Sequence, residues 1–276
     1  DVTEVPGNEG TLLGRTVPPV TGYAPGVLHP IPRVASRASL GMENVPHGVD
    51  LWHAYELSWL DQTGKPVVGV GRFSVPASSP NMVESKSFKL YLNSLNNERF
   101  ESEQAAITRI VADISKVAGE TVELELLAVD APALAGADLE GECIDSQPVD
   151  ATFTGEPEGG MLSLADGGRV IEEKLYSHLL RSLCPVTGQP DWASIWLHYK
   201  GRALHRGALL RYLLSFRNHH EFHEQCVERM FHDIAIACDP QFLHIQGFYT
   251  RRGGMDINPF RSTDAAAKPL PRLNRQ

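Results

Sequence analysis

Two short segments, about forty residues apart, carry the residues best suited to covalent chemistry. The first, LCPVTGQPD, places Cys184 and Asp191 on either side of a turn. The second, NHHEFHEQC, places His223 and Glu224 on an expected helix. A thiolate is a strong nucleophile, and a nearby acid can protonate the atom on which negative charge develops. Together these residues indicate an enzyme with a covalent intermediate rather than a plain soluble domain.

Cys184 has two possible roles, because a single cysteine is more often a small buried hydrophobe than a nucleophile. The strand expected just before it carries aliphatic side chains on one face, which we interpret as the core face. These residues are Ile171, Leu175, Leu179 and Leu183. Since side chains alternate along a strand, Cys184 would then point to the opposite face. It also enters a turn, where loops commonly display functional groups, so both roles stay open.

Asp191 is also open to two interpretations. It follows a proline at a turn, where aspartate is common for structural reasons alone. In the functional interpretation it is an acid held near the thiol, with Trp192 beside it to exclude water and keep it protonated. Such an acid could donate a proton near neutral pH.

The histidine-rich segment suggests a metal site as an alternative. His219 and His223 are spaced i, i+4, as on zinc-binding helices, but neither the HExxH pattern nor a CxxC motif is present. An apolar stripe runs along the same helix and consists of Phe222, Cys226, Met230 and Ile234. We therefore assign Cys226 to packing. His223 and Glu224 lie beside this stripe, where they could be solvated, capping or functional.

Sites for an anionic cofactor have weaker signals. The segment GVGRF lies inside an expected strand without a helix-opening third glycine, so it is not a dinucleotide-binding fingerprint, and no Walker A motif is present. Ser85 and Lys86 stand at an expected helix start, and Arg252 and Gly253 lie in the segment TRRGG. Helix N-termini and basic side chains favour phosphate, so both positions are candidate anion sites.

Composition limits the class of protein. The chain has 276 residues, is 42% hydrophobic and carries a formal net charge of −9. Nine acidic residues and no Lys or Arg lie between Asp130 and Asp166, which leaves 25 acidic and 25 basic residues elsewhere. The balanced remainder argues against binding duplex nucleic acid directly, and no apolar run reaches the roughly 18 residues of a membrane span. With no secretory signal and four cysteines that do not form a disulfide pattern, we expect a reduced, cytoplasmic protein.

The order of elements indicates an α+β fold with two modules. We expect an extended N-terminal arm over residues 1–48, a first module over 49–130, an acidic connection over 131–168 and a second module over 169–276. Each module shows two strands, two helices and a further strand, an order that favours antiparallel sheets over a doubly wound sheet. In the first module two alternating runs flank the segment DQTG, which predicts a hairpin. In the second module we expect a strand over residues 170–183, a helix over 221–237 and a closing strand over 242–250. A shift of 121 positions also aligns six identical residues within fourteen positions. Tyr91, Leu92, Ser94, Asn97, Glu103 and Gln104 then meet Tyr212, Leu213, Ser215, Asn218, Glu224 and Gln225.

These features together resemble the NADPH-dependent 7-cyano-7-deazaguanine reductase family in its long, two-module form. The family signature Glu-Ser-Lys-Ser-apolar-Lys-apolar-aromatic is intact from Glu84 to Tyr91. The Cys–Asp pair and the His-Glu pair match the family in order and spacing. The resemblance implies two tandem tunnelling-fold modules of β-β-α-α-β-β order, with antiparallel sheets and helices on one face, in a homodimer.

The resemblance also implies a reaction and its site. A nitrile on a deazapurine would be reduced to a primary amine by NADPH, without a metal, in the biosynthesis of the modified tRNA base queuosine. Cys184 would form a covalent thioimide and Asp191 would supply a proton. The implied substrate residues are Val83, Glu84, Ser85, His223 and Glu224, and the implied NADPH residues are Ser85, Lys86, Arg252 and Gly253.

Two alternatives from other classes remain at this point. One is a zinc-dependent cyclohydrolase-type enzyme on the same fold, which would use the histidine-rich helix. The other is a non-catalytic module that binds a purine or pterin and consumes no NADPH.

Overall fold

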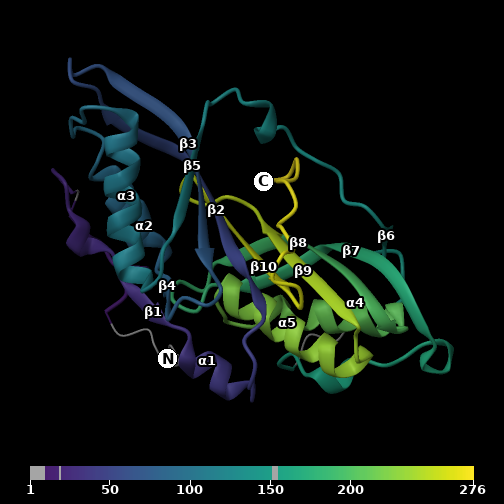
Figure 1. The fold of residues 1–276 in the computed structure, drawn as a ribbon. Helices are drawn as coiled ribbons and strands as arrows, with labels where there is room; N and C mark the ends of the chain where they lie inside the picture. Colours follow the sequence, from purple (N-terminus) through teal and green to yellow (C-terminus); the bar gives the residue numbers. More distant parts are fainter. Residues whose placement is uncertain (1–9, 19, 151–154) are drawn as a thin grey trace. The chain divides into compact units, whose positions relative to one another are not determined.

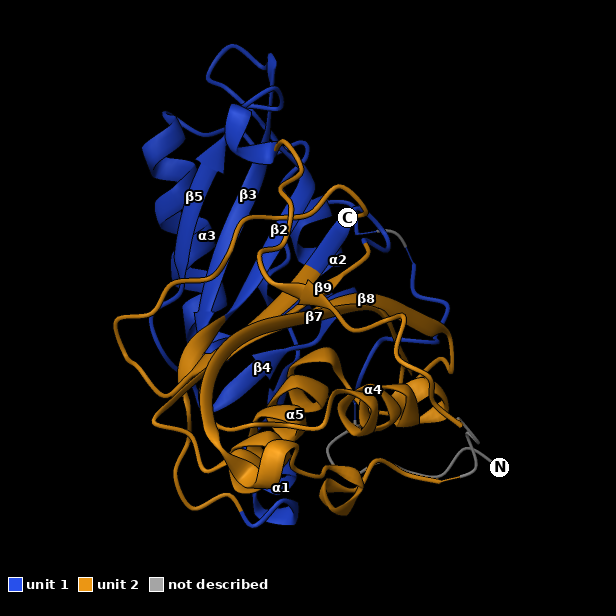
Figure 2. Cartoon of the chain, turned by 90° about the vertical axis from the view of Figure 1, so that its right-hand side faces the viewer, with its two compact units in different colours: residues 1–41, 50–134, 251–256 blue, residues 42–49, 135–250, 257–276 orange. Residues whose placement is uncertain are grey.

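The computed structural model describes residues 10–18, 20–150 and 155–276, so part of the predicted arm and of the acidic connection lies outside the described residues. The chain forms two compact units (Figure 2). Unit 1 comprises residues 1–41, 50–134 and 251–256, and unit 2 comprises residues 42–49, 135–250 and 257–276. The division falls within strands β2 (His47–Leu60) and β10 (Met255–Ser262).

The strands of unit 1 begin with the predicted hairpin. β2 and β3 (Pro66–Pro76) flank the turn, in which the Asp61 carboxylate accepts a hydrogen bond from the Thr63 backbone at 2.9 Å. Gly64 takes a φ of +85°, a conformation that glycine adopts without strain. β5 (Glu123–Leu127) then pairs antiparallel with β3.

Two helices lie against one face of these strands (Figure 1). They are α2 (Ser85–Asn93) and α3 (Glu103–Ala118). Phe88 of α2 stacks on Trp52 with ring centroids 4.7 Å apart, and it meets Phe73 edge-on at 5.1 Å. On α3 the fully buried residues follow a spacing of four and are Ala106, Ile110, Ile114 and Ala118. This spacing marks the stripe of a helix that faces a core.

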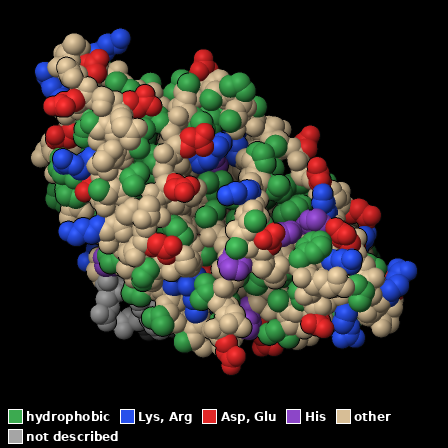
Figure 3. All heavy atoms as spheres, viewed as in Figure 1, with side chains coloured by type: hydrophobic (Ala, Val, Ile, Leu, Met, Phe, Trp, Pro, Cys, Tyr) green, Lys and Arg blue, Asp and Glu red, His purple; other side chains and the backbone are tan. Residues whose placement is uncertain are grey.

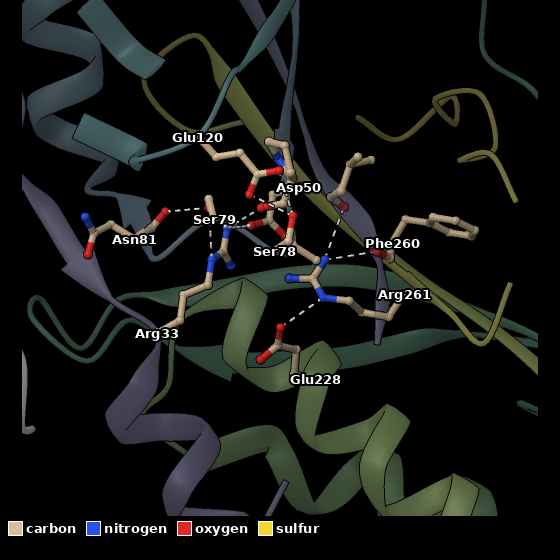
Figure 4. A network of polar contacts seen from close by, with 12 residues as sticks. Arg33, Asp50, Ser78, Ser79, Asn81, Glu120, Glu228, Phe260 and Arg261 are labelled. Atoms are coloured by element: carbon tan, nitrogen blue, oxygen red, sulfur yellow. Dashed lines mark hydrogen bonds and ion pairs between the residues drawn. The ribbon is translucent and has the colours of Figure 1, made fainter. Parts of the chain in front are cut away.

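The N-terminal arm contains secondary structure. Its elements are η1 (Pro25–Val27), β1 (Pro30–Pro32) and α1 (Val34–Ser39), and β1 pairs antiparallel with β4 (Asn81–Val83). Arg33, between β1 and α1, forms a buried ion pair with Asp50 at 2.8 Å (Figure 4). A buried charge is tolerated only when it is paired, so this contact holds the arm against its own unit.

Unit 2 repeats the arrangement. Its sheet has the order β10-β9-β8-β7-β6, antiparallel except for the short parallel pairing of β6 with β7. The strands are β6 (Glu142–Cys143), β7 (Val170–Leu183), β8 (Pro190–Arg202) and β9 (Phe242–Tyr249), and the long helices are α4 (Arg206–Leu214) and α5 (His223–Cys238). The 3-10 turns η2 (Pro132–Leu134), η3 (Gly159–Met161), η4 (Asp166–Gly168) and η5 (Ser215–Asn218) complete the described elements.

A buried ion pair joins helix and sheet within unit 2. Arg261 of β10 donates to Glu228 of α5 at 3.0 Å (Figure 4).

A β-bulge in β7 corrects the predicted core face. The pairing of β7 with β8 shifts register between Ser177 and Leu180. Leu180 is therefore fully buried, whereas Leu179, predicted to be a core residue, is 41% exposed. Because a bulge adds one residue to a strand and changes its alternation, Ser182 and Cys184 follow Leu180 onto the buried face. The prediction that Cys184 points away from the core face was wrong.

Matching contacts confirm the two-module α+β fold. In unit 1 the Tyr91 hydroxyl donates to Asp113 at 2.6 Å, and in unit 2 the Tyr212 hydroxyl donates to Asp233 at the same distance. Tyr91 and Tyr212 are one of the identical pairs found by the shift of 121 positions. The two acids are 120 positions apart, as are the starts of α3 and α5, so the shift of 121 aligns α2 with α4 but is one residue too long for the second helices.

The surface and the helices add two observations. On the face drawn in Figure 3, acidic and basic side chains of the described residues are interspersed, and neither sign forms one broad patch. Within the described ranges, no helix has the length and apolar character needed to cross a membrane.

Candidate active site

The hairpin between β7 and β8 positions Cys184 and Asp191 in unit 2. The Cys184 backbone N–H donates to Gln189 O at 2.9 Å, and Gly188 N–H donates back to Cys184 O at 2.9 Å. Asp191 pairs directly with Ser182 in the sheet. Cys184 is thus a diagonal neighbour of Asp191, and such residues have Cα atoms roughly 7–8 Å apart. The two side chains therefore leave the same face of the hairpin.

Helix α5 completes this cluster at its N-terminus. His223 is the first residue of the helix, and its Nε2 lies 3.2 Å from Asp191 Oδ2. The side chain of Asp191 is 8% exposed and that of His223 is 14% exposed. Glu224 follows on the helix and is buried. The structure therefore places Asp191 and His223 in contact, with Cys184 two residues beyond the sheet partner of Asp191 and Glu224 next to His223 on α5.

The environment of Asp191 differs from the prediction at Trp192. Neighbouring residues on a strand point to opposite faces, so Trp192 does not cover Asp191. Its side chain is 40% exposed and lies between the guanidinium groups of Arg181 and Arg217, each 5.6 Å from the ring centroid. The carboxylate is buried all the same, and His223 of α5 lies against it.

A charged network holds the segment before α5. Glu221 accepts two hydrogen bonds from the Arg229 guanidinium, at 3.0 and 2.8 Å, and lies 3.1 Å from His219 Nε2. Burial alone would raise the pKa of Glu221, but the bonds from His219 and Arg229 outweigh it and hold the pKa below its ordinary value. Glu221 therefore stays ionised and fixes the entry of the chain into α5.

The same network separates the two histidines of the metal hypothesis. His219 lies before α5, so it does not share a helix with His223. Its nitrogens face Glu156 and Glu221, whereas His223 faces Asp191. No group of three or more metal-binding side chains occurs among the described residues. The i, i+4 spacing therefore does not describe two ligands on one helical face.

Buried polar atoms mark the cluster as a place for a ligand. Among the described residues, Ser182 Oγ, His223 Nδ1 and Tyr249 Oη are buried without a well-formed hydrogen bond. Buried polar atoms are nearly always satisfied in folded proteins; the Ser182 and Tyr249 hydroxyls lie close to each other, so His223 Nδ1 is the atom of this set that a polar group of a ligand could satisfy. Cys226 lies nearby and is fully buried, and burial raises the pKa of its thiol. This confirms its assignment to packing.

The predicted residues of unit 1 centre on Glu84. Its side chain caps α2, with Oε2 accepting from the Ser87 backbone at 2.6 Å. Oε1 accepts from Thr11 Oγ1 and from the Leu13 backbone, both at 3.1 Å. A carboxylate offers about four acceptor positions, so about one remains for a ligand. Val83, immediately before Glu84, is buried in β4.

The predicted cofactor residues form a basic group in the same unit. Ser85 begins α2, and the Lys86 ammonium donates to Arg15 O. Lys89 lies one turn along the helix from Lys86, so both face the same side. Gly253 has a φ of +64°, and a Cβ built on it would lie 3.2 Å from Lys89 Nζ. The turn that also contains Arg252 thus approaches the lysines of α2, and this set of donors suits the phosphates of a dinucleotide.

Known proteins match both units. Residues 20–126 match the family described as "Nitrile reductase, 7-cyano-7-deazaguanine-reductase N-term", and residues 190–268 match the one described as "QueF-like protein". The chain is 51% identical over 264 residues to the "NADPH-dependent 7-cyano-7-deazaguanine reductase" of Stenotrophomonas maltophilia K279a, covering 95% of each chain. It is 50% identical over 261 residues to the enzyme of the same name from Dechloromonas aromatica RCB, covering 93% of this chain and 92% of the relative.

The chain belongs to the NADPH-dependent 7-cyano-7-deazaguanine reductase family. Members of this family are oxidoreductases. One solved structure, of an apo archaeosine synthase described as QueF-Like, aligns with a TM-score of 0.31 and 15% identity, covering 36% of this chain and 96% of that one. The family assignment rests on the sequence matches.

Sequence reasoning missed three residues that lie next to predicted site residues of their own unit. Thr11 donates to Glu84 from a distance of 73 residues along the chain, which no local pattern reveals. Tyr249 stacks on His223 and was seen only as part of a closing strand. Ser182 could have been found, because it precedes Cys184 by two positions and a strand places such residues on one face.

Proposed function

We propose that this chain reduces the nitrile of 7-cyano-7-deazaguanine to the primary amine 7-aminomethyl-7-deazaguanine, with NADPH as co-substrate and a thioimide on Cys184 as intermediate. The observation that carries the proposal is the placement of Cys184 and Asp191 on one sheet face, with His223 3.2 Å from Asp191. The match to relatives named for this reaction supports the substrate.

The first step follows from the chemistry of the thiol. Cys184 Sγ attacks the nitrile carbon, so that a sulfur–carbon bond forms and the carbon–nitrogen triple bond becomes a double bond. Asp191 supplies the proton that the nitrogen takes up. A thiolate suits this carbon because both are soft.

The later steps use the same residues. NADPH supplies a hydride in each of two rounds. After the first hydride reaches the carbon, the sulfur–carbon bond breaks, Cys184 leaves as a thiolate and an imine remains. The second hydride and a second proton give the amine, so two hydrides and two protons account for the four-electron reduction. His223 can return a proton to Asp191 through the contact at Nε2.

Recognition of the base is assigned to buried acids. Glu224, at the start of α5, would accept hydrogen bonds from N–H groups of the deazapurine, with His223 beside it. Glu84 would contribute its remaining acceptor position, with Val83 and Ser85 adjacent. Charge-assisted bonds of this kind are stronger than neutral ones, so they suit a substrate with several N–H donors.

The proposal extends to cofactor, assembly and pathway. Ser85, Lys86, Arg252 and Gly253 would hold NADPH, and no metal takes part. We place the enzyme in the cytoplasm, as a homodimer without direct contact to nucleic acid or membrane. Its product would serve the biosynthesis of queuosine in tRNA.

One assay tests the reaction and its nucleophile. Purified protein should oxidise two NADPH molecules for each amine formed when 7-cyano-7-deazaguanine is added. Without NADPH, mass spectrometry should show a single adduct on Cys184. Cys184→Ala should lose the adduct and all turnover, while Cys143→Ala, which alters an exposed thiol, should behave as wild type. The proposal fails if no NADPH is consumed, or if the adduct forms on Cys226 or Cys143.

A further inference from the structure

Tyr249, at the end of β9, lies directly against the histidine of the candidate site. Its ring stacks on the imidazole of His223 with centroids 3.8 Å apart and planes 5° from parallel. Tyr249 is fully buried. The contact is therefore a fixed feature of the interior of unit 2, and none of the steps above uses it.

The backbone of Tyr249 is held on both sides. Its N–H donates to Asn258 Oδ1 at 3.2 Å, and its carbonyl accepts from Gln276 Nε2 at 2.9 Å. Gln276 Nε2 also donates to Asn258 Oδ1. These two side chains tie the end of β9 to β10, and the complete burial of Tyr249 restrains the rotation of its ring.

The imidazole of His223 needs a restraint such as the Tyr249 ring because His223 is the first residue of α5. As the first residue of α5 it has a backbone position set by the helix, but its ring can still rotate about the side-chain bonds. The contact from Nε2 to Asp191 fixes one atom of the ring and leaves the ring plane undetermined. A second flat ring, parallel and in contact, determines that plane.

We propose that Tyr249 is a positioning residue, whose ring sets the plane of the His223 imidazole so that Nε2 faces Asp191. The inference rests on the proposed function insofar as Asp191 and His223 act in proton transfer. The Tyr249 hydroxyl lies near Ser182 but makes no well-formed hydrogen bond among the described residues. The ring rather than the hydroxyl therefore performs this role.

A double-mutant cycle tests the proposal through activity. Tyr249→Leu should slow adduct formation on Cys184 about 10- to 100-fold, because small misplacements of reacting groups have effects of that size. Tyr249→Phe keeps the ring and should stay within about twofold of wild type. In a His223→Ala background, Tyr249→Leu should cause no further loss, and the KM for NADPH should not change in any variant. Equal losses in both backgrounds, or an equal loss in Tyr249→Phe, would overturn the assignment.

A spectroscopic measurement separates this inference from the proposed reaction. A ring stacked on His223 shifts the imidazole protons upfield, and the signal can be assigned by its absence in His223→Ala. The shift should persist in Tyr249→Phe, disappear in Tyr249→Leu and weaken in Gln276→Ala, which loosens Tyr249 without altering either ring. If wild type shows this shift but consumes no NADPH with the nitrile, the proposed function fails and the positioning role stands. If wild type is active and the shift is absent, the positioning role fails alone.

Discussion

Glu84 and His205 occupy the same position in the two units, 121 residues apart, and each caps the first of the two long helices of its unit, α2 and α4. Glu84 accepts from the Ser87 backbone at 2.6 Å, and His205 accepts from the Ala208 backbone at 3.0 Å. The structural role is shared, but only Glu84 carries a carboxylate. His205 is therefore a natural control for every substitution of Glu84.

Replacing these two caps by alanine should separate stability from binding. Both Glu84→Ala and His205→Ala lose an N-cap, which costs about 1 kcal/mol. Glu84→Ala should lose more, because the hydrogen bonds from Thr11 and Leu13 disappear as well. Only Glu84→Ala should weaken binding of the deazapurine. Urea unfolding and calorimetry measure the two effects, and equal substrate affinity in both variants would remove Glu84 from the binding site.

Asp191→Asn should slow both adduct formation and reduction by about 10²–10⁴-fold, because the amide has no acidic proton for nitrogen. The amide oxygen can still accept a hydrogen bond from His223 Nε2, so the fold and the ring position should persist. Single-turnover mass spectrometry measures the adduct directly. Near-wild-type rates in this variant would show that Asp191 is an ordinary turn residue without a role in proton transfer.

Glu224→Gln should weaken substrate binding without affecting NADPH. The substitution keeps the volume of the side chain but removes the charge, and a hydrogen bond to a charged group contributes about 1.5–3 kcal/mol. In a Cys184→Ala background, where no covalent bond forms, calorimetry should show an affinity reduced by about tenfold to a hundredfold. If NADPH affinity falls in step, the change has disturbed the fold rather than recognition of the base.

Stability should depend on pH through His219. Burial alone would lower the pKa of this residue, but the hydrogen bond to Glu221 and the charges of Glu221 and Glu156 raise it above the ordinary value of 6.5. A raised pKa means that the folded state binds the proton more tightly. The stabilisation is therefore fully present below about pH 6.5 and is lost as pH rises through the higher folded-state value.

Urea unfolding at a series of pH values measures this effect. The free energy of unfolding of wild type should fall relative to His219→Gln as pH increases above about 6.5. A difference between the two proteins that stays constant with pH would show that His219 does not titrate in the predicted way.

Local sequence signals predicted most elements of the fold. The DQTG turn between two alternating runs predicted the first hairpin, and the strand expected over residues 170–183 has those bounds in the structure. The helix expected from residue 221 begins at His223, because Phe222 is its N-cap. These signals succeed because turns, caps and alternation depend on residues close together in the sequence.

The buried face of β7 could not be predicted in the same way. The sequence has leucine at both 179 and 180, so the pattern of residue types is the same whichever one is buried. The partner strand decides, and its register is a tertiary property. The contacts of Thr11 with Glu84 and of Tyr249 with His223 are likewise long-range or between elements. The residue types at the site were readable from the sequence, whereas the contacts that hold them were not.

The bulge in β7 has a consequence for protein engineering. The segment LCPVTGQPD could be chosen for transfer to another protein as a self-contained catalytic turn. Within it, the register of the hairpin is enough to keep Cys184 and Asp191 on the same face. Whether that side meets a helix layer or open solvent is decided upstream, by the extra residue between Ser177 and Leu180. If residues from Leu183 onward were grafted onto a strand with regular alternation, the graft would carry the thiol and the acid. The host strand, however, would decide which face of the sheet these side chains occupy. The smallest transferable unit therefore starts at Ser177.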